Sequence, residues 1–161
     1  MNSKYFFLGM LFALIHANGS SQNNASFSAN NTPIYGTTNC GFGFGALNNN
    51  PNSSGGAQTA TGLLALHNDT AGSLNTACGA EALFNNFDGY SNTGIGFRSL
   101  YFNSGGGIQG NNNTSIGYRV MYTNSSGGYN IGLGSESLFF NNFGNFNTAI
   151  GAFALYKNKD N

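Results

Sequence analysis

The residues that could act together chemically in this sequence are four charged side chains at regular spacing. Glu81, Arg98, Arg119 and Glu136 follow one another at steps of 17, 21 and 17 residues. In a chain that coils once per step, each acid would lie beside a base on the neighbouring turn, about one strand spacing away. Such a column is either a set of ion pairs between protomers or a solvated ladder contributing under ~1 kcal/mol per pair. We treat these residues as candidate interface charges and keep both interpretations.

Catalysis and metal binding are not supported by the other polar residues. The sequence holds two histidines, His16 and His67, whereas a metal site needs several convergent ligands. His67 lies near Asp69, but no nucleophile stands at a fixed spacing from them. The glycine-rich segment 41–45 lacks the lysine and the following helix of a phosphate-binding loop. We therefore expect a protein that is not an enzyme and that uses no cofactor or metal.

The two cysteines, Cys40 and Cys78, fall in different positions of the repeat described next. If the repeats stack, two rungs separate the cysteines, which exceeds the ~7 Å limit for a disulfide. Cys78 occupies a position that is held mostly by isoleucine, leucine or phenylalanine in the other copies. We therefore predict that Cys78 is a free and buried thiol.

The elements that position all of these residues are copies of one phrase. Asn75-Thr76-Ala77-Cys78-Gly79 is one copy, which returns from Asn92, Asn113, Asn130 and Asn147, with weaker copies from Asn39 and Gln58. The last glycines of the copies stand at 43, 62, 79, 96, 117, 134 and 151, so most steps are 17 residues. A leucine or methionine follows each glycine after four residues, and an asparagine or aspartate after seven. This regularity is typical of a repeat protein.

The repeat predicts an all-β fold. Several glycines in each copy make a helix improbable, whereas two short strands and two turns fit about 17 residues. One rung cannot bury its apolar residues alone, so the rungs are expected to stack as a parallel β-solenoid of about seven rungs. Two columns should face inward and form the core ladder: Ile95, Ile116, Leu133 and Ile150, together with Leu83, Leu100, Leu138 and Leu155.

Stacking also aligns the asparagines that open the copies. Asn75, Asn92, Asn113, Asn130 and Asn147 should form an amide ladder in which each side chain donates to the next. The two longer steps of the repeat arise from insertions in segments 51–56 and 105–110, which are expected to lie in the turn after the second strand.

The sequence divides into three parts. Residues 1–19 are predicted to be a signal peptide, because Lys4 precedes a mostly apolar stretch at 5–15 and small residues follow near Gly19. Eleven apolar residues are too few for a membrane span, so the mature protein is expected to have none. Residues 20–38 form a polar leader that either stays mobile or covers the first rung, and residues 39–161 form the repeat domain.

Composition narrows the list of partners. Charged residues make up 6% of the chain, and five bases balance five acids. No basic patch could neutralise several phosphates, so nucleic-acid binding is disfavoured. With so few charges, electrostatic repulsion between molecules gives only weak protection against self-association.

The pattern Asn-Thr-Ala-Ile-Gly-x-x-Ala-Leu, seen at residues 147–155, resembles the head repeats of YadA-type trimeric autotransporter adhesins. It is also similar to longer Asn-Thr-Ala-Ile-Gly repeats in secreted bacterial and viral fibre proteins. The likeness covers residues 39–161. It implies a left-handed parallel β-roll, a homotrimer displayed at a surface and no catalysis.

We therefore expect a secreted structural protein, located outside the cell or at its surface, that forms a fibre or an adhesin-like head. Its expected partners are other copies of itself and a glycan or protein of a host or surface. A trimer and a head-to-tail polymer are both open. In the polymer, the leader or first rung of one molecule would complete the last rung of another, unless Lys157, Lys159 and Asp160 blunt that edge. The alternative is a soluble module that binds ice or glycan. The threonine row Thr59, Thr76, Thr93, Thr114 and Thr148 suggests ice, but the row beside it is expected to face inward.

Overall fold

The computed structural model describes residues 25–27, 39–48, 56–103 and 110–158, and only the backbone of residues 25–27. All regular elements in these ranges are three-residue strands. Among these residues there is no helix with the length and apolar character needed to cross a membrane. The predicted signal peptide and the two insertions fall almost wholly outside the described ranges.

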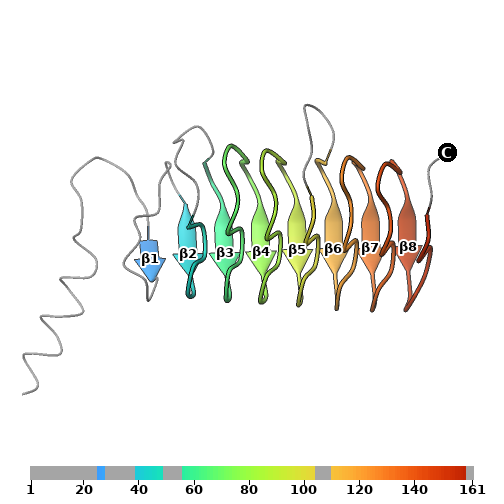
Figure 1. The fold of residues 1–161 in the computed structure, drawn as a ribbon, viewed down its shortest axis with the longest axis horizontal. Coiled ribbons are helices and arrows are strands. Elements are labelled where there is room, and N and C mark those ends of the chain that lie inside the picture. The colour runs from blue at the N-terminus through green and yellow to red at the C-terminus, as the bar shows by residue number, and fades with distance from the viewer. Residues whose placement is uncertain (1–24, 28–38, 49–55, 104–109, 159–161) are drawn as a thin grey trace, which may run out of the picture.

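Eight strands form one parallel sheet in chain order (Figure 1). They are β1 (Ala25–Phe27), β2 (Cys40–Phe42), β3 (Thr59–Thr61), β4 (Thr76–Cys78), β5 (Thr93–Ile95), β6 (Thr114–Ile116), β7 (Ile131–Leu133) and β8 (Thr148–Ile150). Each strand pairs in register with the next, so equivalent repeat positions stack directly on one another. The prediction of a parallel β-solenoid is confirmed, with β2 to β8 opening seven rungs.

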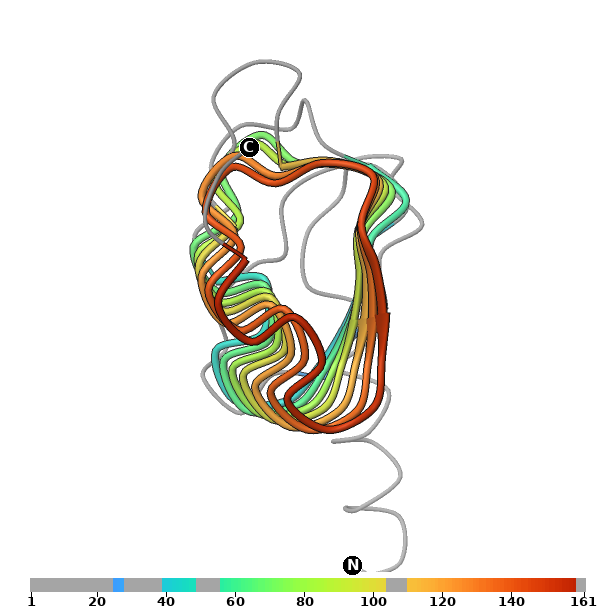
Figure 2. The same ribbon diagram turned by 90° about the vertical axis from the view of Figure 1, so that its right-hand side faces the viewer.

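Each rung is a closed loop whose outline repeats along the axis (Figure 2). The strands lie on a straight side, and the chain zigzags on the opposite side before it turns back. A second ladder joins the rungs there, through the parallel bridges Asn85 to Phe102, Phe102 to Thr123 and Thr123 to Phe140. Backbone hydrogen bonds therefore fix the rungs to one another on both sides of the interior.

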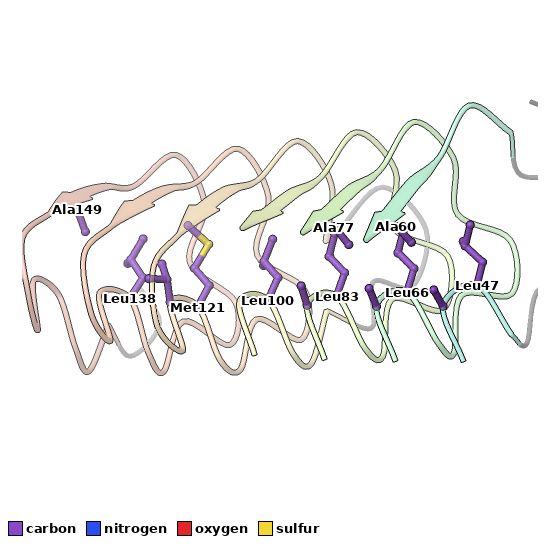
Figure 3. Packing of buried hydrophobic residues seen from close by; sticks show 13 residues of the cluster. Leu47, Ala60, Leu66, Ala77, Leu83, Leu100, Met121, Leu138 and Ala149 are labelled. Carbon is purple, nitrogen blue, oxygen red and sulfur yellow. The ribbon is translucent and has the colours of Figure 1, made fainter. Parts of the chain in front are cut away.

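The interior is filled by the column that starts four residues after each glycine. Leu83, Leu100 and Leu138 are fully buried, as are Leu47, Leu66 and Met121 in the same column (Figure 3). Each of these side chains contributes about 1.5–3 kcal/mol through burial. This half of the predicted core ladder is confirmed, except at Leu155, which is 48% exposed. Leu155 lies in the last rung of the stack, where no further rung among the described residues covers it.

The other half of the predicted core ladder is wrong. Ile95, Ile116 and Leu133 are 36–37% exposed, and Ile150 is 71% exposed. Successive side chains of a strand point to opposite faces, so the third residue of each strand shares the outer face with the first. The middle residue points inward instead, as the exposed-buried-exposed pattern of β4 shows.

Space explains why the middle residue is always small. The column reads Ala60, Ala77, Gly94, Ser115, Gly132 and Ala149. A Cβ placed on Gly94 would lie 3.2 Å from Leu83 Cγ and 3.2 Å from the Ser99 carbonyl oxygen. The leucine column thus already occupies the room that an inward isoleucine would need.

Three columns of non-glycine residues adopt left-handed backbone conformations. One is the buried leucine column itself, for example Leu100 at φ 52°. The second is the charge column, with Glu81 at φ 56° and Arg98 at φ 53°, and the third precedes the amide ladder, with Ser91 at φ 56°. Each such residue costs roughly 1–2 kcal/mol, which the bonds between rungs must offset. These residues interrupt the strand alternation, so that two consecutive residues, such as Ser99 and Leu100, can both face inward.

The predicted amide ladder is present from Asn92 to Asn147, where each side chain donates to that of the preceding rung, but the side-chain link is missing between Asn92 and Asn75. There the backbone N–H of Asn92 donates to Asn75 Oδ1 at 2.9 Å, and its Nδ2 donates to Asn86 Oδ1 and the Gly110 carbonyl oxygen instead. The Oδ1 of Asn92 accepts the backbone N–H of Asn113 at 2.9 Å and its Nδ2 at 3.2 Å. Asn113 and Asn130 repeat this arrangement, as do Asn130 and Asn147. The Nδ2 of Asn75 donates to the Oε1 of Gln58 at 3.2 Å, which extends the ladder by one rung.

A second amide ladder, formed by the residues that stand seven after each glycine, runs beside the first. Asn103 Nδ2 donates to Asn86 Oδ1 at 2.7 Å, and Asn124, Asn141 and Asn158 continue the series. Both ladders donate to one glycine carbonyl in each turn, such as Gly110 O, which Asn92 and Asn103 share. Amide groups therefore satisfy one another in this buried part of each rung.

The leader contributes one strand. β1 pairs in parallel with β2, with Ala25 opposite Cys40 and Phe27 opposite Phe42. Of the two alternatives for the leader, covering the first rung is the one observed for this segment. This strand also protects the backbone edge of β2 from pairing with another chain.

Candidate interaction surfaces

The four candidate interface charges pair within the chain. Arg98 Nε lies 2.8 Å from Glu81 Oε2, and Arg119 Nη1 lies 3.2 Å from Glu136 Oε1. Both pairs join adjacent rungs, as the spacing predicted. Because the order is acid, base, base, acid, each arginine pairs with a carboxylate on the side that faces away from the other arginine.

The arginines also lie over aromatic rings. Arg98 Cζ is 4.9 Å from the centre of Phe97, and Arg119 Cζ is 4.7 Å from Phe139 and 4.9 Å from Tyr122. Cation–π contacts at partly exposed sites contribute about 0.5–1 kcal/mol each. The charges are thus compensated within one solenoid, and a role between protomers stays a prediction.

A continuous aromatic stack runs along the solenoid beside this charge column. It consists of His67, Phe84, Tyr101, Tyr122, Phe139 and Tyr156. Neighbouring centroids are 5.1–5.3 Å apart and the rings are close to parallel. His67 begins this stack and its Nδ1 lies 2.8 Å from the Gly45 carbonyl oxygen, so its role is structural.

Two further phenylalanines lie against the side of the stack. Phe102 is 4.7 Å from Tyr101 with an interplanar angle of 84°, and Phe140 is 4.6 Å from Phe139 at 77°. Both are exposed, by 41% and 36%. The sequence analysis missed these residues, although Tyr101-Phe102 and Phe139-Phe140 are adjacent aromatic pairs of which only one member can join the stack.

The outer side of the sheet forms another surface, here called the strand face. It comprises the first and third residues of β2 to β8: Cys40, Phe42, Thr59, Thr61, Thr76, Cys78, Thr93, Ile95, Thr114, Ile116, Ile131, Leu133, Thr148 and Ile150. None of these residues is charged. At ~4.8 Å per rung the face is roughly 30 Å long.

Both cysteines lie on the strand face. They are free and exposed, so the prediction that Cys78 is buried is wrong for the same reason as for the isoleucine column. Their positions differ as expected: Cys40 is a first strand residue and Cys78 a third. In the part of the chain that the structure describes, no three histidine, cysteine or acidic side chains gather as a metal site would require.

One carboxylate is buried inside the solenoid. Asp69 occupies an asparagine position of the second amide ladder and accepts hydrogen bonds from Gln58 Nε2 at 2.6 Å and Asn86 Nδ2 at 3.0 Å. Burial raises the pKa of Asp69 to about 6, against the lowering effect of these hydrogen bonds. Because Asp69 hydrogen-bonds to interior groups of the ladders, we assign it a structural role and no role in binding.

Comparison with known proteins gives no relative: no protein-family model matches the chain, and neither the curated proteins nor the solved structures contain a match.

Proposed function

We propose that this is a secreted, non-enzymatic structural protein whose solenoids associate side by side through the strand face. The observation that carries the proposal is the exposed, uncharged column of Ile95, Ile116, Leu133 and Ile150. Contiguous apolar surface of this kind marks interaction sites in soluble proteins. Secretion and an extracellular or cell-surface location rest on the N-terminal sequence pattern, and a trimeric head rests on the resemblance to adhesin repeats.

Side-by-side association is favoured over a head-to-tail polymer. β1 already pairs with the edge of β2, so the leader strand is engaged within its own molecule. A polymer joined through that strand would first have to break this pairing. The strand face, in contrast, presents its side chains without any rearrangement.

Self-association is also favoured over ice binding. The sequence argued against ice binding because the column beside the threonine row was expected to face inward. In the structure that column faces outward, so this argument no longer holds. However, that column reads Phe42, Thr61, Cys78, Ile95, Ile116, Leu133 and Ile150. Only β3 (Thr59–Thr61) offers two threonines, so the face lacks a regular lattice of hydroxyl groups.

Sedimentation velocity on the purified protein over a range of concentrations tests the proposal. We expect the wild-type protein to form a discrete oligomer and the Ile95→Lys, Ile116→Lys double variant to be monomeric. Charges brought together on a buried apolar face would have to be desolvated without partners. The matched control is Phe87→Lys with Phe143→Lys, since both phenylalanines are exposed on turns outside the strand face.

The control variant should associate like the wild type. A wild-type protein that stays monomeric at high concentration would remove the proposal. Equal association of the two lysine variants would instead place the interface elsewhere on the molecule.

A further inference from the structure

We infer that Phe102 and Phe140 form a binding platform for an extended polysaccharide whose pyranose rings are joined by β-1,4 linkages. Both residues belong to the second ladder of the solenoid, whereas the strand face belongs to the sheet. The inference therefore adds a ligand site to the proposed function and does not depend on self-association.

The contacts of Tyr101 fix how Phe102 lies. Both faces of the Tyr101 ring are covered, by Phe84 from one rung and Tyr122 from the next, each at 5.1 Å and 5°. Phe102 must therefore meet the edge of Tyr101, and its distance of 4.7 Å is too short for two edges to meet. With an interplanar angle of 84°, the face of Phe102 rests on that edge.

Phe102 also lies across the next ring of the stack, 5.9 Å from Tyr122 at 88°. One face of Phe102 thus covers the edges of two tyrosines. The other face points away from the stack, which accounts for its 41% exposure.

Phe140 repeats this arrangement two rungs later. The faces of Phe139 are covered by Tyr122 and Tyr156, both at 5.1 Å. Phe140 lies against the edge of Phe139 at 4.6 Å and of Tyr156 at 5.6 Å, nearly perpendicular to both. Two flat rings therefore present their outer faces on the same side of the solenoid.

The ladder sets the distance between these rings. Phe102 pairs with Thr123, and Thr123 pairs with Phe140, in parallel register. Two rungs of a β-ladder correspond to about 9.6 Å along the axis.

This spacing fits a β-1,4-linked pyranose chain. Each sugar in such a chain is turned over relative to its neighbours, so every second ring presents the same face. Its disaccharide repeat is close to twice the ~4.8 Å strand spacing. The axial C–H groups of an equatorially substituted pyranose carry partial positive charge, and an aromatic face is the negative region of its quadrupole. Alternate sugars would therefore stack on Phe102 and Phe140.

The residue between the two rings suits the intervening sugar. Thr123 Oγ1 donates its proton to the Phe139 carbonyl oxygen at 3.2 Å, so its lone pairs can accept a sugar hydroxyl. A protein partner that docked by apolar contact would require a contiguous patch, which Thr123 interrupts. The alternation of ring and hydroxyl thus favours a polysaccharide over a protein.

The test is depletion of the full-length protein from solution by insoluble cellulose and by chitin, with granular starch as the α-linked control. We expect binding to at least one of the first two polymers and none to starch. Binding to cellulose only, or to chitin only, would identify glucose or N-acetylglucosamine as the sugar.

The Phe102→Leu, Phe140→Leu double variant keeps apolar volume but removes the flat faces. It should bind at least ~10-fold more weakly, with an unchanged thermal unfolding midpoint. The matched Phe87→Leu, Phe143→Leu variant should bind like the wild type. Absence of wild-type binding to both β-1,4-linked polymers, or equal binding by the Phe102→Leu, Phe140→Leu variant, would overturn the inference.

Discussion

Two columns of this solenoid carry aliphatic side chains in successive rungs, and they have opposite environments. The leucine column is fully buried up to Leu138, whereas the side chains of the isoleucine column are exposed, by 36% at Ile116. Both recur in strict register, and both hold large apolar side chains in every rung from β5 to β8. Two factors give them different orientations: the space that neighbouring side chains leave in the interior, and the backbone conformation at each position.

The difference shows that periodicity identifies a column but not its direction. In a strand, the outward position of Thr114 also places Ile116 outward, because the two residues are on the same face. At Leu100, a left-handed conformation breaks the alternation and turns the side chain into the interior. Interior columns should therefore be sensitive to changes that the outer ones tolerate.

The largest effect is expected when an interior amide is replaced by an apolar side chain of similar size. In Asn92→Leu, the backbone N–H of Asn113 and one of the two N–H groups of its Nδ2 lose their acceptor inside the solenoid, while the other Nδ2 N–H keeps the Gly127 carbonyl oxygen. Two unsatisfied groups predict a loss of about 2–6 kcal/mol in the free energy of unfolding, measured by urea denaturation. Asn142→Leu, on a partly exposed turn, is the control and should cost much less. Similar losses for the two variants would mean that the ladder does not stabilise the fold.

The next effect concerns the buried carboxylate and depends on pH. The pKa of Asp69 is about 6 in the folded protein, against 3.8 for an ordinary, solvent-exposed aspartate, so the folded state binds the proton more tightly than the unfolded state does. The contribution of Asp69 to the free energy of unfolding is therefore fully present below pH ~4. It is lost as the pH rises through ~6, by on the order of 2–3 kcal/mol. Asp69→Asn should abolish this slope and be the more stable protein at pH 7. Identical pH profiles of unfolding for both proteins would contradict the assignment.

A smaller effect compares the two directions within one strand. Gly94→Val places a side chain against Leu83 and the Ser99 carbonyl, and should cost about 1–3 kcal/mol by overpacking. Thr93→Val, one residue away on the outer face, should stay within about 0.5 kcal/mol of the wild type. Thermal unfolding of the two variants measures the contrast, and the reverse ranking would invert the orientation of β5.

The smallest effect tests the left-handed columns. Ser91 has φ 56°, so Ser91→Gly relieves strain and should stabilise the protein by about 0.5–1 kcal/mol, after the entropy of the unfolded chain is counted. Ser73→Gly, at the neighbouring repeat but without a positive φ, should destabilise it by about 0.5–1 kcal/mol. Calorimetric midpoints that move in the same direction for both variants would argue against the strain.

Much of the architecture could be predicted from the sequence, because stacking converts sequence period into spatial contact. The parallel solenoid, the buried Leu100 column, the amide ladder through Asn92 and the Glu81–Arg98 pair all follow from register alone. The outward direction of Ile116 could also have been derived from strand alternation.

Other features could not be predicted, because they depend on packing that local propensities oppose. Leucine and arginine rarely adopt positive φ, so the left-handed columns at Leu100 and Arg98 have no local signal. The spacing that places Asn103 seven residues after a glycine does not show whether its amide is buried in a ladder or exposed on a turn. The orientation of Phe102 depends on Phe84, Tyr101 and Tyr122 filling the stack first.

The central claim is that the leucine column is the core and the isoleucine column is the surface used for association. The most direct test is the free energy of unfolding of Leu100→Ala and Ile116→Ala at a dilute and a high protein concentration. We expect Leu100→Ala to cost about 2–5 kcal/mol at both concentrations. Ile116→Ala should cost only about 1 kcal/mol in dilute protein, because its side chain is partly covered and lies in a strand, with a larger loss where the wild type self-associates. A dilute Ile116→Ala protein as destabilised as Leu100→Ala would contradict the account.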